Sequence, residues 1–332
     1  MKRASIKDIA RIAGVSVATV SYVLNKKEGS RISEATKKKI LEVAETINYT
    51  PNKIAKSLKM SKSKLIGLIV ADISNDFYSN IARSIEDEAM KLGYTLLIGS
   101  SDETPEKFRK LTELFSEQQV DGMIVAPVVE SDEAINKLIA AEYPIVTIDR
   151  YLKNVSLPGV MINNSEISEY ICDELVKKEF EEIIYVGYDT KLPHLLDRQD
   201  GFDKRISKSD IPAKRLLIGI HNITPEVHSK LRENLDLGKK AAIYFSSNKL
   251  GIAGLRYLND NKIRVPEDVS VIAFDETEAY HLFPTDVSFI QQPLTDMAKE
   301  SVKLLDNQIN SYTPNGKRVT FHAKYMERNS VK

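Results

Sequence analysis

The chain has 332 residues, of which 42% are hydrophobic and 28% are charged, with 47 basic and 47 acidic side chains. This length and composition predict a globular protein of two or three domains and exclude a disordered chain. The sequence has no N-terminal apolar segment and no run of about 18 uncharged apolar residues, so we expect a cytoplasmic protein without a membrane span.

Metal and cofactor sites have no support in the sequence. Cys172 is the single cysteine, which excludes internal disulfides and cysteine-ligated zinc, and the five histidines lack metal-ligand spacing. We therefore expect no metal and no cofactor.

The zero net charge conceals an uneven distribution. Residues 1–64 contain 15 Lys and Arg but 5 Asp and Glu, a net charge of +10, so residues 65–332 carry −10. A basic segment on an acidic remainder is typical of a nucleic-acid-binding module with a larger carrier. The alternative is that residues 1–48 are merely a small three-helix bundle.

Residues 6–25 have the pattern of a helix-turn-helix. Apolar residues recur at helical spacing over 6–13, Gly14 suits the positive φ of a tight turn, and Ser16 is a good N-cap for a second helix. A third helix is expected from a Ser33 cap to residue 48. Together these elements predict an all-α head that binds DNA.

The second helix should present Val17, Ala18 and Tyr22 to the DNA bases. Val17 and Ala18 can only touch a thymine methyl, so direct readout depends on Tyr22. Hydroxyl and amide side chains are the expected phosphate contacts, with ordinary helix caps as the alternative: Ser5, Ser16, Thr19, Ser21 and Asn25.

Residues 49–64 join the head to the remainder. Pro51 suits the first turn of a short helix with apolar Ala55 and Leu58 between lysines. Such a helix is too short to be stable alone, but two copies on DNA would bury each other's apolar edges. The alternative is a flexible basic linker.

Residues 65–332 alternate between apolar strands and helices. Nine strand segments lie between residues 65 and 273, and a further strand at 287–291 precedes a helix at 294–310. This alternation predicts parallel sheets covered by helices on both faces, and nine strands are too many for one small lobe.

Polar residues follow several of these strands, where ligands of open α/β sheets bind. Asp149 and Asp275 are such residues, and carboxylates, guanidinium groups and aromatic rings suit a polyhydroxyl ligand. Alternatives remain: the aspartates could cap the next turn, Arg198 could pair on the surface with a neighbouring aspartate, and Phe77 could be core.

Several motifs together resemble a LacI/GalR-family transcription regulator. They are IKDIA at 6–10, AGVSVATVS at 13–21, NYTPN at 48–52 and AKSL at 55–58. Residues 72–78, 97–102 and 144–150 are similar to the fructose catabolite repressor/activator branch. The resemblance implies a periplasmic-binding-protein-like effector domain of two doubly wound α/β lobes with three crossovers. Lobe one would span 65–161 and 289–332, and lobe two 162–288.

The resemblance also implies roles for individual residues. Residues 49–64 would contain a hinge helix in the minor groove, with contacts from Asn52 and Ala55 and a wedge at Leu58. The effector would be bound by six side chains: Phe77, Asp149, Arg198, Ser247, Asp275 and Gln292. Where relatives usually read Thr/Ala-Asn-Asp and Asp-Asp, this chain has Ser-Ser-Asn at 246–248 and Asp-Glu at 275–276. Fewer carboxylates would ease binding of an anionic sugar.

The expected function is sequence-specific repression of transcription by a homodimer whose operator affinity a small sugar or sugar phosphate controls. A dimer is expected because one recognition helix reads only about half a turn of duplex. The alternatives are a non-catalytic sugar receptor and a sugar-metabolising enzyme. G-x-S-x-G, P-loop and G-x-G-x-x-G motifs are absent, so we expect no enzyme.

Overall fold

The computed structural model describes residues 4–24, 32–49, 62–313 and 316–332. Contacts divide the chain into two compact units, Met1–Ser63 and Lys64–Lys332. The expected contacts of Asn25, Asn52, Ala55 and Leu58 lie outside the described residues.

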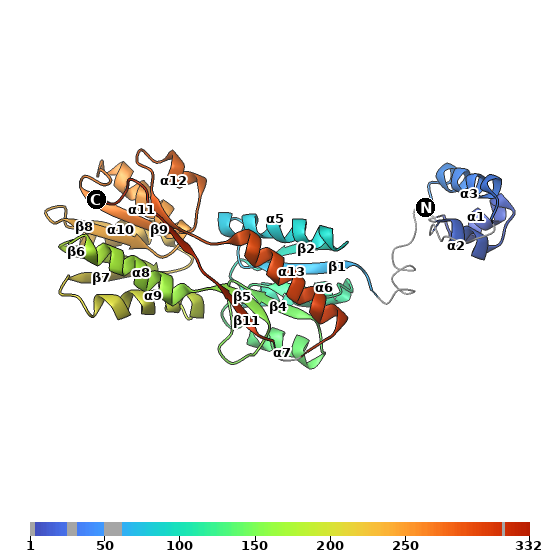
Figure 1. Cartoon of the computed structure of the whole chain (residues 1–332), viewed down its shortest axis with the longest axis horizontal. Coiled ribbons are helices and arrows are strands. Elements are labelled where there is room, and N and C mark those ends of the chain that lie inside the picture. The colour runs from blue at the N-terminus through green and yellow to red at the C-terminus, as the bar shows by residue number, and fades with distance from the viewer. Residues whose placement is uncertain (1–3, 25–31, 50–61, 314–315) are drawn as a thin grey trace. The chain divides into compact units, whose positions relative to one another are not determined.

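The described residues of the first unit form three helices, shown in blue in Figure 1: α1 (Ile6–Ala13), α2 (Val17–Leu24) and α3 (Glu34–Thr46). Each contributes a fully buried side chain to one small core, namely Ile9, Val20 and Ile40. Gly14 ends α1 with φ +67°, a left-handed conformation that glycine adopts at no steric cost. The predicted helix-turn-helix is therefore confirmed.

Serine side chains begin all three helices. The Oγ atoms of Ser5, Ser16 and Ser33 accept hydrogen bonds from the backbone N–H three residues later, at 3.4, 3.0 and 3.3 Å. These bonds satisfy amides that have no partner within the helix.

The second unit contains two six-stranded sheets. The first has the order β11-β5-β4-β3-β1-β2, and all its strands are parallel. Its strands are β1 (Leu65–Val70), β2 (Thr95–Ser100), β3 (Met123–Val125), β4 (Ile145–Ile148), β5 (Gly159–Ile162) and β11 (Arg318–Phe321).

The second sheet has the order β12-β10-β9-β8-β6-β7, and only β12 runs antiparallel to its neighbour. Its strands are β6 (Glu182–Tyr188), β7 (Ala213–Ile218), β8 (Ala241–Phe245), β9 (Val269–Phe274), β10 (Ser288–Gln291) and β12 (Lys324–Met326).

Helices cover both faces of each sheet (Figure 1). On the first sheet, α5 (Asp76–Lys91) and α13 (Leu294–Asn310) pack together on one face, and α6 (Pro105–Glu117) and α7 (Asp132–Ala140) lie on the other. On the second, α8 (Asn164–Lys177) and α9 (Pro193–Ile206) lie opposite α10 (Ile223–Asn234) and α11 (Asn248–Asp260), and short α12 spans Glu278–Leu282. The predicted two-lobed, doubly wound architecture is confirmed.

The chain after residue 288 contributes to both sheets, whereas the expected lobe limits assigned residues 289–332 to the first lobe alone. β10 pairs with β9 of the second sheet, α13 and β11 belong to the first, and β12 returns to the second. The three-residue edge strand β12 escaped prediction because so short a segment shows no alternation of apolar and polar residues.

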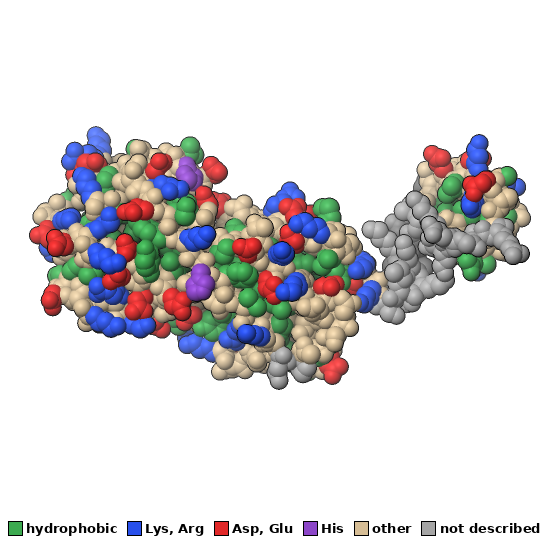
Figure 2. Space-filling view, viewed as in Figure 1, with side chains coloured by type: hydrophobic (Ala, Val, Ile, Leu, Met, Phe, Trp, Pro, Cys, Tyr) green, Lys and Arg blue, Asp and Glu red, His purple; other side chains and the backbone are tan. Residues whose placement is uncertain are grey.

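Charged side chains of both signs are interspersed over the visible face of the second unit (Figure 2). Its net negative charge is therefore not gathered into one patch on that face. Within the described residues, no helix is both long and apolar enough to cross a membrane.

Candidate functional site

The exposed face of α2 is the candidate nucleic-acid interface of the first unit. Val17 and Tyr22 are 41% and 47% exposed, Ala18 is exposed, and Val20 on the opposite side is fully buried. The helix carries no charged residue, so its surface can approach an apolar or polar groove edge without desolvating a charge.

Expected phosphate contacts surround this face. Ser5 and Ser16 are exposed, and Thr19 and Ser21 are half-buried. Ser5 also donates its Oγ proton to Asp8 at 2.7 Å, and the hydroxyls of Ser16 and Thr19 lie 2.8 Å apart. The hydroxyls of Ser5, Ser16 and Thr19 thus take part in local helix caps, as the alternative interpretation required, while staying at the surface.

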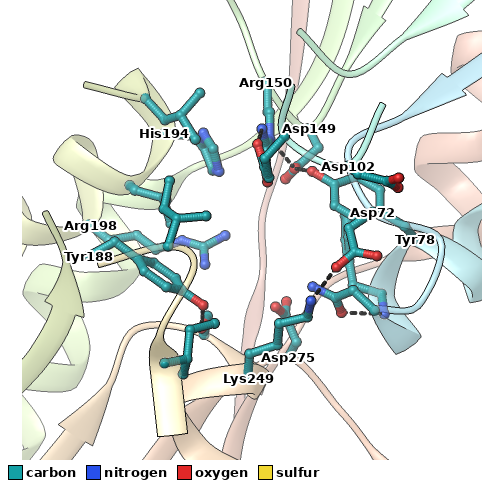
Figure 3. Close-up of a pocket in the computed structure, with 18 of the residues that line it drawn as sticks. Asp72, Tyr78, Asp102, Asp149, Arg150, Tyr188, His194, Arg198, Lys249 and Asp275 are labelled. Carbon is teal, nitrogen blue, oxygen red and sulfur yellow. Dashed lines mark hydrogen bonds and ion pairs between the residues drawn. The ribbon is translucent and has the colours of Figure 1, made fainter. Parts of the chain in front are cut away.

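A cavity of about 190 Å³ lies between the two sheets of the second unit. Loops after β1, β4, β8, β9 and β10 and the first turns of α9 supply its walls, so both lobes contribute side chains (Figure 3). The carboxyl ends of parallel strands meet here, which is where open α/β sheets place their ligands.

Two aspartates occupy equivalent positions on the two lobes. Asp149 directly follows β4 and Asp275 directly follows β9, with φ of +65° and +63°, a region that aspartate enters more readily than most residues. Asp149 accepts a hydrogen bond from the Tyr78 hydroxyl at 2.8 Å, and Asp275 accepts one from Gln292 Nε2 at 2.6 Å. Both carboxylates bond across to other elements, so neither caps its own turn.

Burial raises the pKa of both carboxyl groups. Asp149 and Asp275 are 4% and 7% exposed. For Asp275 burial outweighs the opposing charge of Arg198 and the hydrogen bond from Gln292, and raises the pKa to about 6. For Asp149 burial likewise exceeds the effect of Arg150 and Arg198, so its pKa also lies above the ordinary value.

Two arginines with different partners reach the cavity. Arg150 forms a bidentate ion pair with Glu103, at 2.7 and 2.5 Å. Arg198 donates from Nε to Asn164 Oδ1 and from Nη1 to the carbonyl oxygen of Ser246, both at 2.8 Å. Its guanidinium lies 3.5 Å from the centre of the Phe274 ring. Among the described residues Arg198 forms no ion pair, which excludes the surface pairing considered above.

His194 lies one helical turn before Arg198 on α9 and points into the same cavity (Figure 3). It is 4% exposed, and its Nδ1 atom has no hydrogen-bond partner within the described residues. Burial, followed by the charges of Arg150 and Arg198, holds the pKa of His194 well below its ordinary value, so the imidazole is neutral.

Direct contacts join the two lobes beside the cavity. Lys249 at the start of α11 forms an ion pair with Asp72 after β1. The side chain of Asn248 donates to Asn75 at 2.7 Å, and Thr277 donates to Asp76 at 2.6 Å. These contacts connect the N-terminal end of α5 with the second lobe.

Both units of the chain are similar to known bacterial proteins. Residues 5–52 match the profile of the bacterial regulatory proteins of the lacI family, and residues 172–331 match that of the periplasmic binding protein-like domain. The "HTH-type transcriptional regulator RegA" of Clostridium saccharobutylicum is 31% identical over 332 residues, covering 98% of this chain and 99% of RegA. The chain belongs to the lacI family of bacterial regulatory proteins.

Solved structures of lacI-family proteins share its fold. The lac repressor dimer bound to operator and the anti-inducer ONPF is 21% identical, with a TM-score of 0.84 and 99% of each chain covered. The transcriptional regulator CelR in complex with cellobiose is also 21% identical, with a TM-score of 0.71, covering 99% of this chain and 100% of CelR. The predicted family and the predicted function as a DNA-binding transcriptional regulator are confirmed.

All six predicted effector contacts of this lacI-family regulator line the one cavity: Phe77, Asp149, Arg198, Ser247, Asp275 and Gln292. Each is buried, with 3–7% of its surface exposed. The ring of Phe77 packs edge-on against Tyr78, with centroids 4.9 Å apart, so it belongs both to the core and to the cavity wall. Their role as effector ligands stays a prediction.

The cavity also contains Asp72, Tyr78 and Arg150, which belong to the stretches after β1 and β4 where a ligand site was expected. Sequence patterns did not predict three other cavity residues, Tyr188, His194 and Lys249. Helical spacing contained a signal for one of them, because residues four apart share a helix face and His194 precedes Arg198 by four. His221, which lies in the loop before α10, is exposed and also reaches the cavity.

The cavity is not poor in carboxylates. The differences from the family pattern at 246–248 and 275–276 predicted easier binding of an anionic sugar. Five acidic residues nevertheless line the cavity: Asp72, Asp102, Glu103, Asp149 and Asp275. Four of these precede the second lobe in sequence, so a comparison confined to the two motifs of the second lobe overlooks them. Within the described residues, no group of His, Cys, Asp and Glu is arranged to hold a metal.

Proposed function

We propose that this lacI-family regulator is a homodimeric repressor whose operator affinity is controlled by a small carbohydrate, either a sugar or a sugar phosphate, bound between its two lobes. The observation that carries the proposal is the buried cavity, with polar side chains from both lobes. A ligand that contacts both walls changes the free-energy difference between lobe arrangements. CelR, a protein of the same fold, has been solved with cellobiose.

For DNA recognition, we propose that α2 enters the major groove with Val17, Ala18 and Tyr22 toward the bases. Four hydroxyl side chains would contact phosphates: Ser5, Ser16, Thr19 and Ser21. Asn25, and the hinge contacts Asn52, Ala55 and Leu58, complete the proposed interface. The exposure of the α2 residues supports the base-facing assignment.

The proposed domain division assigns residues 1–48 to the head, 49–64 to the hinge and 65–332 to effector binding and dimerisation. Self-association would bury exposed apolar side chains of the last segment, among them Met90, Ile98 and Leu282, which are 63%, 47% and 82% exposed. The lac repressor, with the same fold, has been solved as a dimer on its operator.

Two finer assignments belong to the same proposal. The chain acts in the cytoplasm, where operator DNA is located, and it catalyses no reaction. Its likeness at 72–78, 97–102 and 144–150 supports a place near the fructose catabolite repressor/activator branch.

The test begins with selection of bound sequences from a random DNA library by the full-length protein. A near-palindromic site is the expected product. Operator affinity is then measured by fluorescence anisotropy with and without sugars and sugar phosphates, and a ligand should change it by about 5–150-fold, the usual range of allosteric coupling. Selection of no sequence would overturn the DNA-binding proposal, and operator affinity unaffected by every compound would overturn the effector proposal.

Two variants separate the proposed sites. Leu58→Ala should weaken operator binding and leave sugar binding intact, whereas Arg198→Ala should abolish the sugar response and leave operator binding intact. Equal operator affinity of Leu58→Ala and the unmodified protein would contradict the hinge assignment. Recovery of every sugar unchanged after incubation separates this regulator from a sugar-metabolising enzyme.

A further inference from the structure

We infer that the interlobe cavity selects an uncharged polyhydroxyl ligand and discriminates against phosphate esters and other anions. The inference rests on the effector-binding function proposed above and narrows its ligand class. It depends on which charges in the cavity are already paired and which polar atoms still lack a partner.

The charge lining the cavity is predominantly negative. Five carboxylates face three cationic side chains, which are Arg150, Arg198 and Lys249. One of the five, Asp102, is paired with Lys107 outside the cavity lining, which leaves four carboxylates for the three cations. Two of these cations are already paired across the cavity wall, Arg150 with both oxygens of Glu103 and Lys249 with Asp72. An incoming anion would therefore have to displace an existing ion pair or approach excess carboxylate charge.

Arg198 does not provide a free phosphate site. Two of its N–H groups bond to Asn164 and to the Ser246 carbonyl, and its guanidinium plane packs on Phe274. Its charge also opposes the burial-induced rise in the pKa of Asp149 and Asp275, which shows that it compensates these two carboxylates. The remaining N–H groups can each donate to a neutral oxygen without supplying net positive charge to the cavity.

Some of the polar atoms that remain are acceptors and require hydrogen-bond donors from the ligand. Gln292 Oε1 is buried without a partner in the described residues, and the carboxylates of Asp149 and Asp275 also accept. A sugar hydroxyl both donates and accepts, so it satisfies these atoms, whereas a phosphate dianion has no proton to donate. An acceptor left unsatisfied in a buried site destabilises the complex.

Two further atoms suit the same ligand. Arg150 Nε and His194 Nδ1 are buried without a hydrogen-bond partner in the described residues, although Nε lies 3.7 Å from Asp149 Oδ2. The first donates, and the neutral imidazole nitrogen of the second donates or accepts according to its tautomer. The rings of Phe77, Tyr78 and Tyr188 line the cavity as well and can cover the apolar C–H face of a sugar. The cavity therefore offers donors, acceptors and an apolar wall. A neutral polyol has the matching acceptors, donors and C–H face.

Matched pairs of probes test the inference on the full-length protein. D-glucose, D-fructose and D-ribose are compared with glucose 6-phosphate, fructose 1-phosphate and ribose 5-phosphate by thermal shift and calorimetric titration. At least one free sugar should raise the unfolding temperature. Its phosphate ester should bind roughly tenfold or more weakly, because like charges would be brought together in a buried site.

A pair of Glu→Gln variants examines the physical cause. Glu103→Gln removes the bidentate partner of Arg150, which keeps only Asp149 at 3.7 Å, and so makes the cavity less negative by one charge. This change should narrow the difference in affinity between the phosphate ester and the free sugar at least severalfold. Glu300→Gln removes the partner of Lys303 on α13, outside the cavity, and should leave the difference in affinity between ester and sugar unchanged. The unfolding temperature without ligand establishes that each variant is folded.

The outcomes separate this inference from the proposed function. Tighter binding of any ester than of its free sugar would overturn the inference while preserving control by a carbohydrate. Equal effects of Glu103→Gln and Glu300→Gln would also overturn it, because the charge balance of the cavity would then not set the preference. Absence of binding by all six probes would overturn both the inference and the effector proposal, while the selected operator would still test DNA binding separately.

Discussion

Lys249 of the second lobe forms an ion pair with Asp72 of the first lobe, at the edge of the interlobe cavity. The two residues are 177 positions apart, and their side chains are 33% and 24% exposed. Screening by water is therefore incomplete, and the pair contributes to the lobe arrangement seen here.

We expect a double-mutant cycle on this pair to reveal coupling. Asp72→Asn, Lys249→Met and the combined variant, measured by urea unfolding, should give a coupling energy of about 0.5–1 kcal/mol. The Lys204–Glu169 pair joins two helices of a single lobe and is a suitable control. Its loss should leave the radius of gyration unchanged, whereas loss of the Asp72–Lys249 pair should increase it. Identical scattering of both sets of variants would contradict a role in holding the lobes together.

The pKa of about 6 at Asp275 predicts that the stability difference between the Asp275→Asn variant and the unmodified protein depends on pH. Because the folded-state pKa exceeds the ordinary value of 3.8, the contribution of Asp275 to stability is fully present below pH 4 and is lost as the pH rises through 6. Asp275→Asn removes the buried charge, so at pH 7.5 it should be more stable than the unmodified protein by about 1–3 kcal/mol. Asp149 and His194 titrate in both proteins, so their contributions largely cancel in the comparison.

Unfolding by urea between pH 4 and pH 8 measures this difference. The advantage of Asp275→Asn should decrease as the pH falls through 6. An advantage that is constant across this range would show that Asp275 does not titrate as its burial requires.

His194 should contribute to sugar affinity through Nδ1. The amide of Asn occupies nearly the position of Nδ1, whereas the amide of Gln occupies that of Nε2. We expect His194→Leu and His194→Gln to weaken binding of the tightest sugar probe by roughly 10–100-fold, because an unsatisfied ligand hydroxyl costs about 1–3 kcal/mol. His194→Asn should restore most of the affinity.

Calorimetric titration at pH 7.5 compares the three variants, and their unfolding temperatures control for packing. If His194 only fills space, affinity should follow the unfolding temperature of each variant and Asn should offer no advantage over Gln.

Gly201 permits the close approach of α9 to α8. A Cβ atom at this position would lie 2.1 Å from the carbonyl oxygen of Ser165, a backbone atom that cannot rotate away. Gly201→Ala should destabilise the second unit by about 1–3 kcal/mol despite the better helix propensity of alanine. Because α9 also carries His194 and Arg198, sugar affinity should decrease as well.

Gly238→Ala is the matched control. Its Cβ would lie 3.2 Å from the Asp236 side chain at the surface, where a small adjustment relieves the contact. Chemical unfolding measures the free energy of unfolding of both variants. Equal stability of Gly201→Ala and the unmodified protein would show that α8 can move aside without cost.

Local patterns in the sequence determined much of this protein. Gly14 and Ser16 identified the helix-turn-helix because a turn glycine and an N-cap act on their immediate neighbours. Asp149 and Asp275 were found because any residue at the carboxyl end of a parallel strand is delivered to the same edge of a sheet. These inferences need only the period of apolar residues and the direction of the chain.

Only the tertiary structure decided how the charges combine. Arg150 meets Glu103 across 47 positions, Lys249 meets Asp72 across 177, and Arg198 is left to balance buried aspartates without forming an ion pair. No sequence pattern encodes those pairings, because they depend on which loops the fold brings together, within the first lobe for Arg150 and between the lobes for Lys249. The ligand preference inferred for the cavity follows from these pairings, since a cation that is already paired cannot neutralise a phosphate.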